Sequence, residues 1–81
     1  MATVDIQYFA QLKDAAKASG EVWTLEREDT PQSIYAKLKE THGFVLESSE
    51  LRVAINDEFG SMTQTLSAGD KITFIPPVSG G

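Results

Sequence analysis

The sequence ends in two glycines, Gly80 and Gly81. A glycine carboxylate at the end of a segment without bulky side chains becomes a reactive acyl group once it is activated. Because glycine has no Cβ, such a segment can thread a slot that is too narrow for any other residue. Pro76 and Pro77 hold φ near an extended value, so we expect the segment to leave the domain stiffly. The four residues that follow them span at most about 13 Å, enough to enter a pocket in a partner. We predict that Gly81 carries the chemistry and that a partner binds the remaining tail residues, namely Pro76, Pro77, Val78, Ser79 and Gly80.

No set of side chains in the sequence competes with this terminus as a reactive site. His42 is the only histidine, and its position just before Gly43 favours an interaction with the C-terminus of a predicted helix over catalysis. We find no Ser-His-Asp set, no phosphate-binding loop and no spacing typical of a metal site, so we predict no metal. The charged run at residues 26–29 is interpreted as a solvated loop. The absence of cysteine excludes disulfides and thiolate ligands.

The composition is that of one small globular domain. The chain has 81 residues, 41% of them hydrophobic and 23% charged, and a net charge of −5. Its basic residues are scattered, which argues against nucleic acid as a partner because such binding depends on neutralising phosphates. An acidic protein suits a partner with a basic docking surface, although the charge can equally serve solubility alone. With no apolar run long enough for a membrane span and no signal-peptide pattern at the N-terminus, we expect a cytosolic protein.

The elements that must position the terminus follow from periodicity and from capping residues. Alternation predicts strands over residues 3–9, 21–25, 51–55 and 71–75. An alanine-rich helix is expected over 11–19, ended by a glycine cap at Gly20. The main helix is predicted to begin after Thr30, with Pro31 in its first turn, and to end at Gly43. Turns are expected at 56–58 and 67–70, with a short segment near 59–62 that pairs back.

This order predicts an α+β domain over residues 1–75 with an extended tail over 76–81. The first and last strands are both apolar enough to be central. If they pair in parallel, the tail leaves from the middle of a mixed sheet packed on one main helix. That arrangement is the β-grasp, or ubiquitin-like, architecture.

Three apolar residues near the predicted tail root are candidates for partner docking. Phe9 and Ile75 are out of phase with neighbouring core positions of their strands, and Phe59 follows a polar turn where core packing does not explain an aromatic. We predict that they form an apolar patch that docks partner proteins. The alternative is that they fill the small core.

The sequence resembles the ubiquitin-like sulfur carriers, and in particular the small subunits of molybdopterin synthase. The most specific part of the resemblance is the ending Phe-Ile-Pro-Pro-Val-Ser-Gly-Gly at residues 74–81. Further support comes from Tyr-Phe-Ala-Gln-Leu at 8–12, Val-Ala-Ile-Asn at 53–56 and Leu-Ser-Ala-Gly-Asp at 66–70. The resemblance covers essentially the whole chain.

The resemblance implies a reaction sequence in which this chain is acted upon by others. A ubiquitin-activating-like enzyme adenylates the Gly81 carboxylate with ATP, and a sulfur donor protein then displaces AMP to leave a thiocarboxylate. The tail next enters the large subunit, where its sulfur passes to a cyclic pyranopterin monophosphate precursor. The chain is then the non-catalytic, sulfur-donating subunit of a heteromeric sulfurtransferase in molybdenum cofactor biosynthesis. It is inactive alone and has no permanently bound cofactor.

Three other interpretations remain open from the sequence. The chain could carry sulfur for thiamine synthesis, although those carriers are usually shorter and lack the two prolines before the terminal motif. It could be a ubiquitin-like modifier that is joined to lysines through an activated Gly81. It could also be an interaction module whose tail is a frayed, idle terminus.

Overall fold

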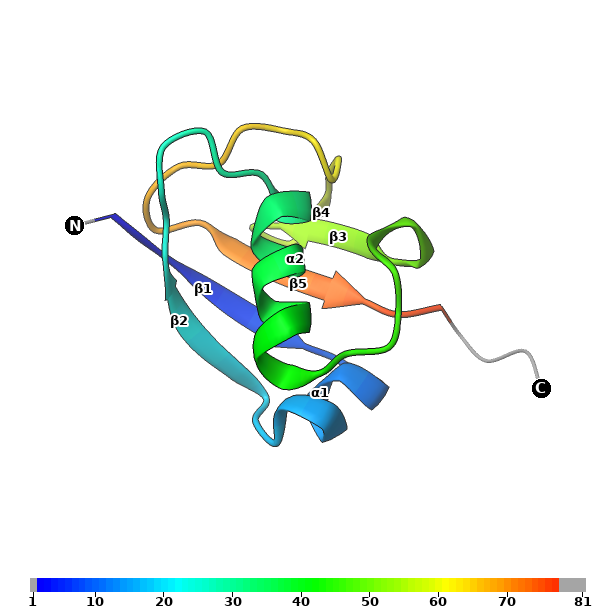
Figure 1. Ribbon diagram of the computed structural model, residues 1–81. Coiled ribbons are helices and arrows are strands. Elements are labelled where there is room, and N and C mark those ends of the chain that lie inside the picture. Colours follow the sequence, from blue (N-terminus) through cyan, green and yellow to red (C-terminus); the bar gives the residue numbers. More distant parts are fainter. Residues whose placement is uncertain (1, 78–81) are drawn as a thin grey trace.

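The structure, a computed structural model, describes residues 2–77 and contains a five-stranded sheet crossed by one long helix (Figure 1). Across the sheet the strands are ordered β2-β1-β5-β3-β4. Their bounds are β1 Thr3–Tyr8, β2 Gly20–Thr24, β3 Arg52–Ile55, β4 Glu58–Phe59 and β5 Lys71–Ile75. The helical elements are α1 Ala10–Ala16, α2 Pro31–His42 and a 3-10 turn, η1 Ser48–Glu50. This is the α+β architecture that the sequence predicts.

The two central strands, β1 and β5, run parallel, as predicted, with Ile6 beside Ile72 and Tyr8 beside Phe74. Every other pair of neighbouring strands is antiparallel. Because side chains alternate between the two faces of a strand, one set of residues faces α2 and the other faces away. The strict alternation of exposed and buried residues in β1 follows this rule.

The core lies between the sheet and α2. Its members are the apolar residues on the inner face of the sheet, the inner face of α2 and the loops that close the ends: Val4, Ile6, Tyr8, Leu12, Ile34, Tyr35, Leu38, Phe44, Leu51, Val53, Ile55, Leu66, Ile72 and Phe74. Removing this apolar surface from water is the main force holding the two layers together. The opposite face of the sheet carries no helix in the part of the chain drawn in colour (Figure 1).

The boundaries of α2 are those predicted. The Thr30 side chain accepts a hydrogen bond from the Ser33 amide, and the Ser33 hydroxyl accepts one from the Thr30 amide, so two amides of the first turn are satisfied. Pro31 occupies the first turn, where a missing N–H costs nothing. Gly43 ends the helix with φ of 73°, a left-handed conformation that favours glycine.

The predicted glycine cap of the first helix is wrong. Helix α1 ends at Ala16, and its C-cap is Lys17, which adopts the left-handed conformation with φ of 59° three residues before Gly20. Gly20 instead opens β2, and a Cβ at that position would lie 2.5 Å from the carbonyl oxygen of Ile6. The glycine is therefore required by the close approach of β2 to β1 and not by a helix end.

Candidate functional site

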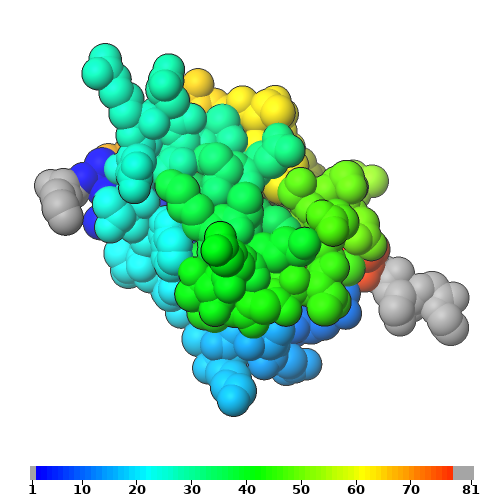
Figure 2. Space-filling view, viewed as in Figure 1, coloured from blue at the N-terminus to red at the C-terminus, as the bar shows by residue number. Residues whose placement is uncertain are grey.

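The root of the tail is the end of the central strand β5. Ile75 is its last residue and pairs with Arg52 of β3, while Phe74 lies between Tyr8 of β1 and Val53 of β3. Because β5 is flanked by a strand on each side, its end is held at a defined place in the molecule. Figure 2 shows the red end of the described chain emerging beside the green segment that precedes β3.

Pro76 is buried and Pro77 is exposed, so the described chain leaves the folded body after Pro76. Proline has no N–H to donate, which fits the end of the strand ladder at Ile75. The remaining predicted tail residues, Val78, Ser79, Gly80 and Gly81, lie outside the described residues.

The three predicted docking residues lie on the sheet face that points away from α2. Phe9 is 50% exposed and Phe59 is 75% exposed, so neither fills the core. Phe59 pairs with Ala54 of β3, and the next outward-facing position of that strand, Arg52, pairs with the partly buried Ile75. Phe9 directly follows Tyr8, the partner of Phe74, and so reaches the level of Ile75. The structure thus brings all three to the same face near the tail root, while their docking role stays a prediction.

Two further apolar side chains are exposed in the structure although the sequence analysis did not predict it. Val22 of β2 is 64% exposed and Val45, in the loop after α2, is 86% exposed. Val22 alternates with Glu21 and Trp23, so its outward direction could have been found from the period of the strand. The local sequence around Val45, Phe-Val-Leu, gives no comparable signal, because Phe44 is buried and Val45 is not.

His42 takes part in a polar cluster that the sequence does not reveal. It lies in the last turn of α2, as predicted, and its Nε2 is 2.7 Å from Glu21 Oε2. The same carboxylate oxygen accepts a hydrogen bond of 2.6 Å from the hydroxyl of Tyr8. Burial of the Tyr8 side chain, with the hydrogen bond to Glu21 and its negative charge, raises the pKa of that phenol above its usual range. The cluster joins β1, β2 and α2, and its partners come from distant parts of the chain.

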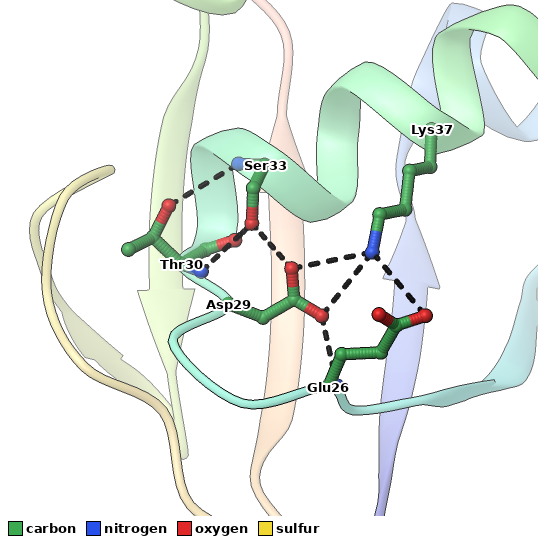
Figure 3. A network of polar contacts seen from close by, with 5 residues as sticks. All are labelled: Glu26, Asp29, Thr30, Ser33 and Lys37. Atoms are coloured by element: carbon green, nitrogen blue, oxygen red, sulfur yellow. Dashed lines mark hydrogen bonds and ion pairs between the residues drawn. The ribbon is translucent and has the colours of Figure 1, made fainter.

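The interpretation of residues 26–29 as a solvated loop is wrong for Asp29, which is only 7% exposed. Figure 3 shows its carboxylate turned toward Ser33 and Lys37 of α2. Its carboxylate accepts hydrogen bonds from the Ser33 hydroxyl at 2.6 Å and the Glu26 amide at 2.9 Å, and it pairs with Lys37 at 3.3 Å. Burial alone would raise the pKa of Asp29, but these donors together hold it below its usual value. Asp29 therefore fastens the loop after β2 to the first turns of α2.

Within residues 2–77 no three acidic or histidine side chains gather closely enough to hold a metal ion. None of the helices in that stretch is long and apolar enough to cross a membrane. The described body thus supplies an anchored tail root and three apolar side chains on the outer face of the sheet, and its polar clusters are built into the packing of the fold.

A mixed sheet with a parallel central pair and one crossing helix defines the class of β-grasp, ubiquitin-like proteins. The family model of the ThiS family matches residues 6–81. The chain therefore belongs to the ThiS family of ubiquitin-like sulfur carriers.

Solved structures with the same fold come from archaea and bacteria. SAMP1 from Haloferax volcanii is 23% identical, with a TM-score of 0.79, and the match covers 98% of this chain and 99% of that one. A putative molybdopterin converting factor, subunit 1, from Pyrococcus furiosus is 22% identical, with a TM-score of 0.79 and coverage of 96% and 100%. A complex of subunits 1 and 2 of molybdopterin-converting factor from Helicobacter pylori matches at 24% identity, with a TM-score of 0.66 and coverage of 98% and 99%. At these identities the likeness establishes the fold alone.

Proposed function

We propose that this chain is the sulfur-carrying small subunit of a molybdopterin synthase, with Gly81 as the residue that bears the sulfur. An activating enzyme joins the Gly81 carboxylate to AMP from ATP, and a sulfur donor converts the adenylate into a thiocarboxylate. The large subunit then receives the tail and directs the sulfur to a cyclic pyranopterin monophosphate. The chain has no activity by itself and works in the cytoplasm.

The chemistry explains why such a carrier needs an activating partner. A carboxylate is a poor electrophile because its negative charge repels nucleophiles. When a carboxylate oxygen attacks the α-phosphate of ATP, pyrophosphate leaves and a mixed anhydride forms. Hydrosulfide delivered by the sulfur donor can then attack the acyl carbon, and AMP departs with the electron pair of the broken C–O bond. The resulting thiocarboxylate holds sulfur as a nucleophile on an arm without side chains.

The observation that carries this proposal is the position of the tail root. The chain leaves the body at Pro76-Pro77, directly after a strand that is paired on both sides. A root fixed in this way lets a partner that grips the body also aim the tail. The outward-facing Phe9, Phe59 and Ile75 lie near the root, where a partner that receives the tail can grip the body.

The proposal is tested on the terminal residue. Intact-mass analysis of the chain purified from its native cells should find a form in which sulfur replaces one oxygen at Gly81. Deleting Gly81, or adding one residue after it, should abolish sulfur transfer in a reconstituted assay while leaving the circular dichroism spectrum unchanged. Full activity of either variant would refute the role assigned to this residue.

Docking is tested separately from the chemistry. Phe59→Asp places a charge at an exposed side chain, so we expect it to weaken binding to the large subunit by at least roughly tenfold with little loss of stability. Val22→Asp is the control, because Val22 is also an exposed apolar residue but lies on β2, which β1 separates from the strand that leads into the tail. Unchanged affinity of Phe59→Asp in a calorimetric titration would remove this residue from the docking patch.

A second candidate function, a ubiquitin-like protein modifier, is favoured by the similarity to SAMP1, the small archaeal modifier protein 1. A modifier uses the same activated Gly81 but forms an amide bond to lysines of other proteins. The two functions separate on a denaturing gel of whole cells that express a tagged chain. A ladder of lysine conjugates that disappears on deletion of Gly81 supports the modifier, and a single free species supports the dedicated carrier.

A further inference from the structure

Strand β2 forms one edge of the sheet, and its backbone is paired on one side only (Figure 1). The Leu25 amide donates to the Ala2 carbonyl and the Tyr8 amide donates to the Ser19 carbonyl. In an antiparallel pair such hydrogen-bonded positions recur at every second residue, so Glu21 and Trp23 also turn their N–H and C=O groups toward β1. The backbone groups of Gly20, Val22 and Thr24 therefore point away from the sheet.

These three residues, Gly20, Val22 and Thr24, define what we call the β2 edge. It contains no proline and no β-bulge, the devices that commonly protect an edge from further pairing. The Val22 side chain is 64% exposed on the outer face of the sheet. On the helix-facing side a groove of about 270 Å³ runs along the strand, lined by Val22, Trp23, Thr24, Glu26 and Lys37. An added strand would thus find backbone partners and side-chain contacts on both faces.

The charges that border the β2 edge leave it negative. Lys37 is paired with Asp29 at 3.3 Å, and Lys71 is paired with Asp57 at 2.6 Å, so both nearby cations have partners. Asp5, directly beside Val22, makes no ion pair with any residue of 2–77. Glu26 is 71% exposed and reaches Lys37 only at 3.9 Å.

We propose that the β2 edge binds an extended, lysine- or arginine-bearing segment of another protein, which joins the sheet as a sixth strand. Main-chain hydrogen bonds to Gly20, Val22 and Thr24 hold the segment, as in other cases of strand addition. Its apolar residues cover Val22 on the outer face, and its cations lie near Asp5 and Glu26. This surface is separated from the tail root by β1, so the inference does not depend on the role of Gly81.

A second copy of this chain is the less suitable occupant. Two β2 edges can meet symmetrically about Val22, because the residues with outward-pointing groups are spaced evenly on either side of it. Each copy, however, carries a net charge of −5 and brings the same carboxylates to the contact. Like charges across a strand pair oppose association.

The test uses the full chain, labelled with nitrogen-15, and a capped heptapeptide of alternating lysine and valine. We expect the peptide to slow amide hydrogen exchange at Gly20, Val22 and Thr24. The amides of Glu21 and Trp23 should change little, because they are already bonded to β1. The same peptide with glutamate in place of lysine should bind at least roughly tenfold more weakly, since it is repelled by Asp5 and Glu26.

Two variants connect the binding to this edge. Val22→Pro removes an outward-pointing N–H donor, and edge strands tolerate proline at such a position. We expect it to weaken binding of the lysine peptide by roughly tenfold. Val22→Lys keeps the donor but adds a cation that repels the peptide, and Val45→Lys is its matched control on the far loop. The proposal is overturned if exchange at the three amides does not slow or if both peptides bind equally. It is also overturned if Val45→Lys weakens binding as much as Val22→Lys, or if the free chain already protects these amides as a dimer.

Discussion

Asp29 is a buried carboxylate that accepts from the Ser33 hydroxyl, the Glu26 amide and Lys37. Replacing it with asparagine removes the negative charge and turns one acceptor into a donor that faces other donors. We expect Asp29→Asn to lower the free energy of unfolding by about 2 kcal/mol, as measured by urea denaturation. The control is Glu28→Gln, an exposed neighbour that should change it by less than about 0.5 kcal/mol. Equal effects of the two substitutions would contradict the role given to Asp29.

Glu21 links the buried Tyr8 hydroxyl to His42, so its removal leaves a phenol without a partner. We expect Glu21→Ala to cost about 1–3 kcal/mol of stability, because an unsatisfied buried donor is more costly than a missing bond. The additional change Tyr8→Phe removes the orphaned hydroxyl and should recover part of that loss. A double mutant less stable than Glu21→Ala alone would show that the Tyr8 hydroxyl has another partner.

At this scale the sequence predicted what local periodicity can reveal. Phe9 is out of phase with the buried residues of its strand and Phe59 follows a polar turn, which predicts that both side chains face outward, and both are exposed. The contacts of Glu21 and Asp29 were missed. Glu21 meets His42 across a separation of 21 residues, which no local pattern encodes. In the sequence Asp29 is one residue of a charged run, and nothing distinguishes it from its neighbours. Its role depends on Lys37 and the first turn of α2, which only the fold brings into contact with it.

Helix α1 has an unusual C-cap, because Lys17 adopts the left-handed conformation there. The left-handed conformation costs a residue with a Cβ about 1–2 kcal/mol. Glycine avoids this steric cost but loses more conformational entropy on folding, which offsets part of the gain. We expect Lys17→Gly to stabilise the protein by about 0.5 kcal/mol. Lys13→Gly, within the same helix, should instead destabilise it by about 1 kcal/mol. The two variants should therefore shift the thermal midpoint in opposite directions, and a shift of the same sign would contradict the cap assignment.

Element boundaries were predictable where capping residues act locally and not where tertiary contacts decide. Thr30, Pro31 and Gly43 bound α2 through bonds within one turn, and their positions were predicted correctly. The sequence predicts a helix cap at Gly20 because glycine commonly ends helices, yet the structure needs this glycine for the approach of β2 to the Ile6 carbonyl. That contact belongs to the sheet, and it becomes visible only after β1 and β2 are paired.

For the whole molecule, we expect Asp29 to contribute to the fall in the free energy of unfolding at acid pH. Its pKa is lowered in the folded protein, so the unfolded chain binds a proton first as the pH falls. The stabilisation is fully present above the unfolded value of about 4 and is lost as the pH falls through the folded value. We expect urea denaturation between pH 6 and pH 3 to show a steeper loss for the native sequence than for Asp29→Asn. Parallel profiles for the two proteins would assign the fall at acid pH to other carboxylates.

At alkaline pH the free energy of unfolding falls as the pH rises, and we expect the buried tyrosines to cause this fall. Burial of Tyr35, together with the negative charges of Glu47 and Glu50, raises the pKa of its phenol from 10.0 to about 12. Above pH 10 the unfolded chain releases this proton while the folded protein keeps it, so the free energy of unfolding falls as the pH rises toward 12. A difference of this size corresponds to about 2–3 kcal/mol. Tyr35→Phe loses the hydrogen bond to the Leu46 carbonyl and should be less stable at pH 8, but its profile should be flatter between pH 10 and 12. Because every other titrating group is shared by the two proteins, an equally steep decline in the variant would mean that Tyr35 ionises as readily in the folded protein as in the unfolded chain.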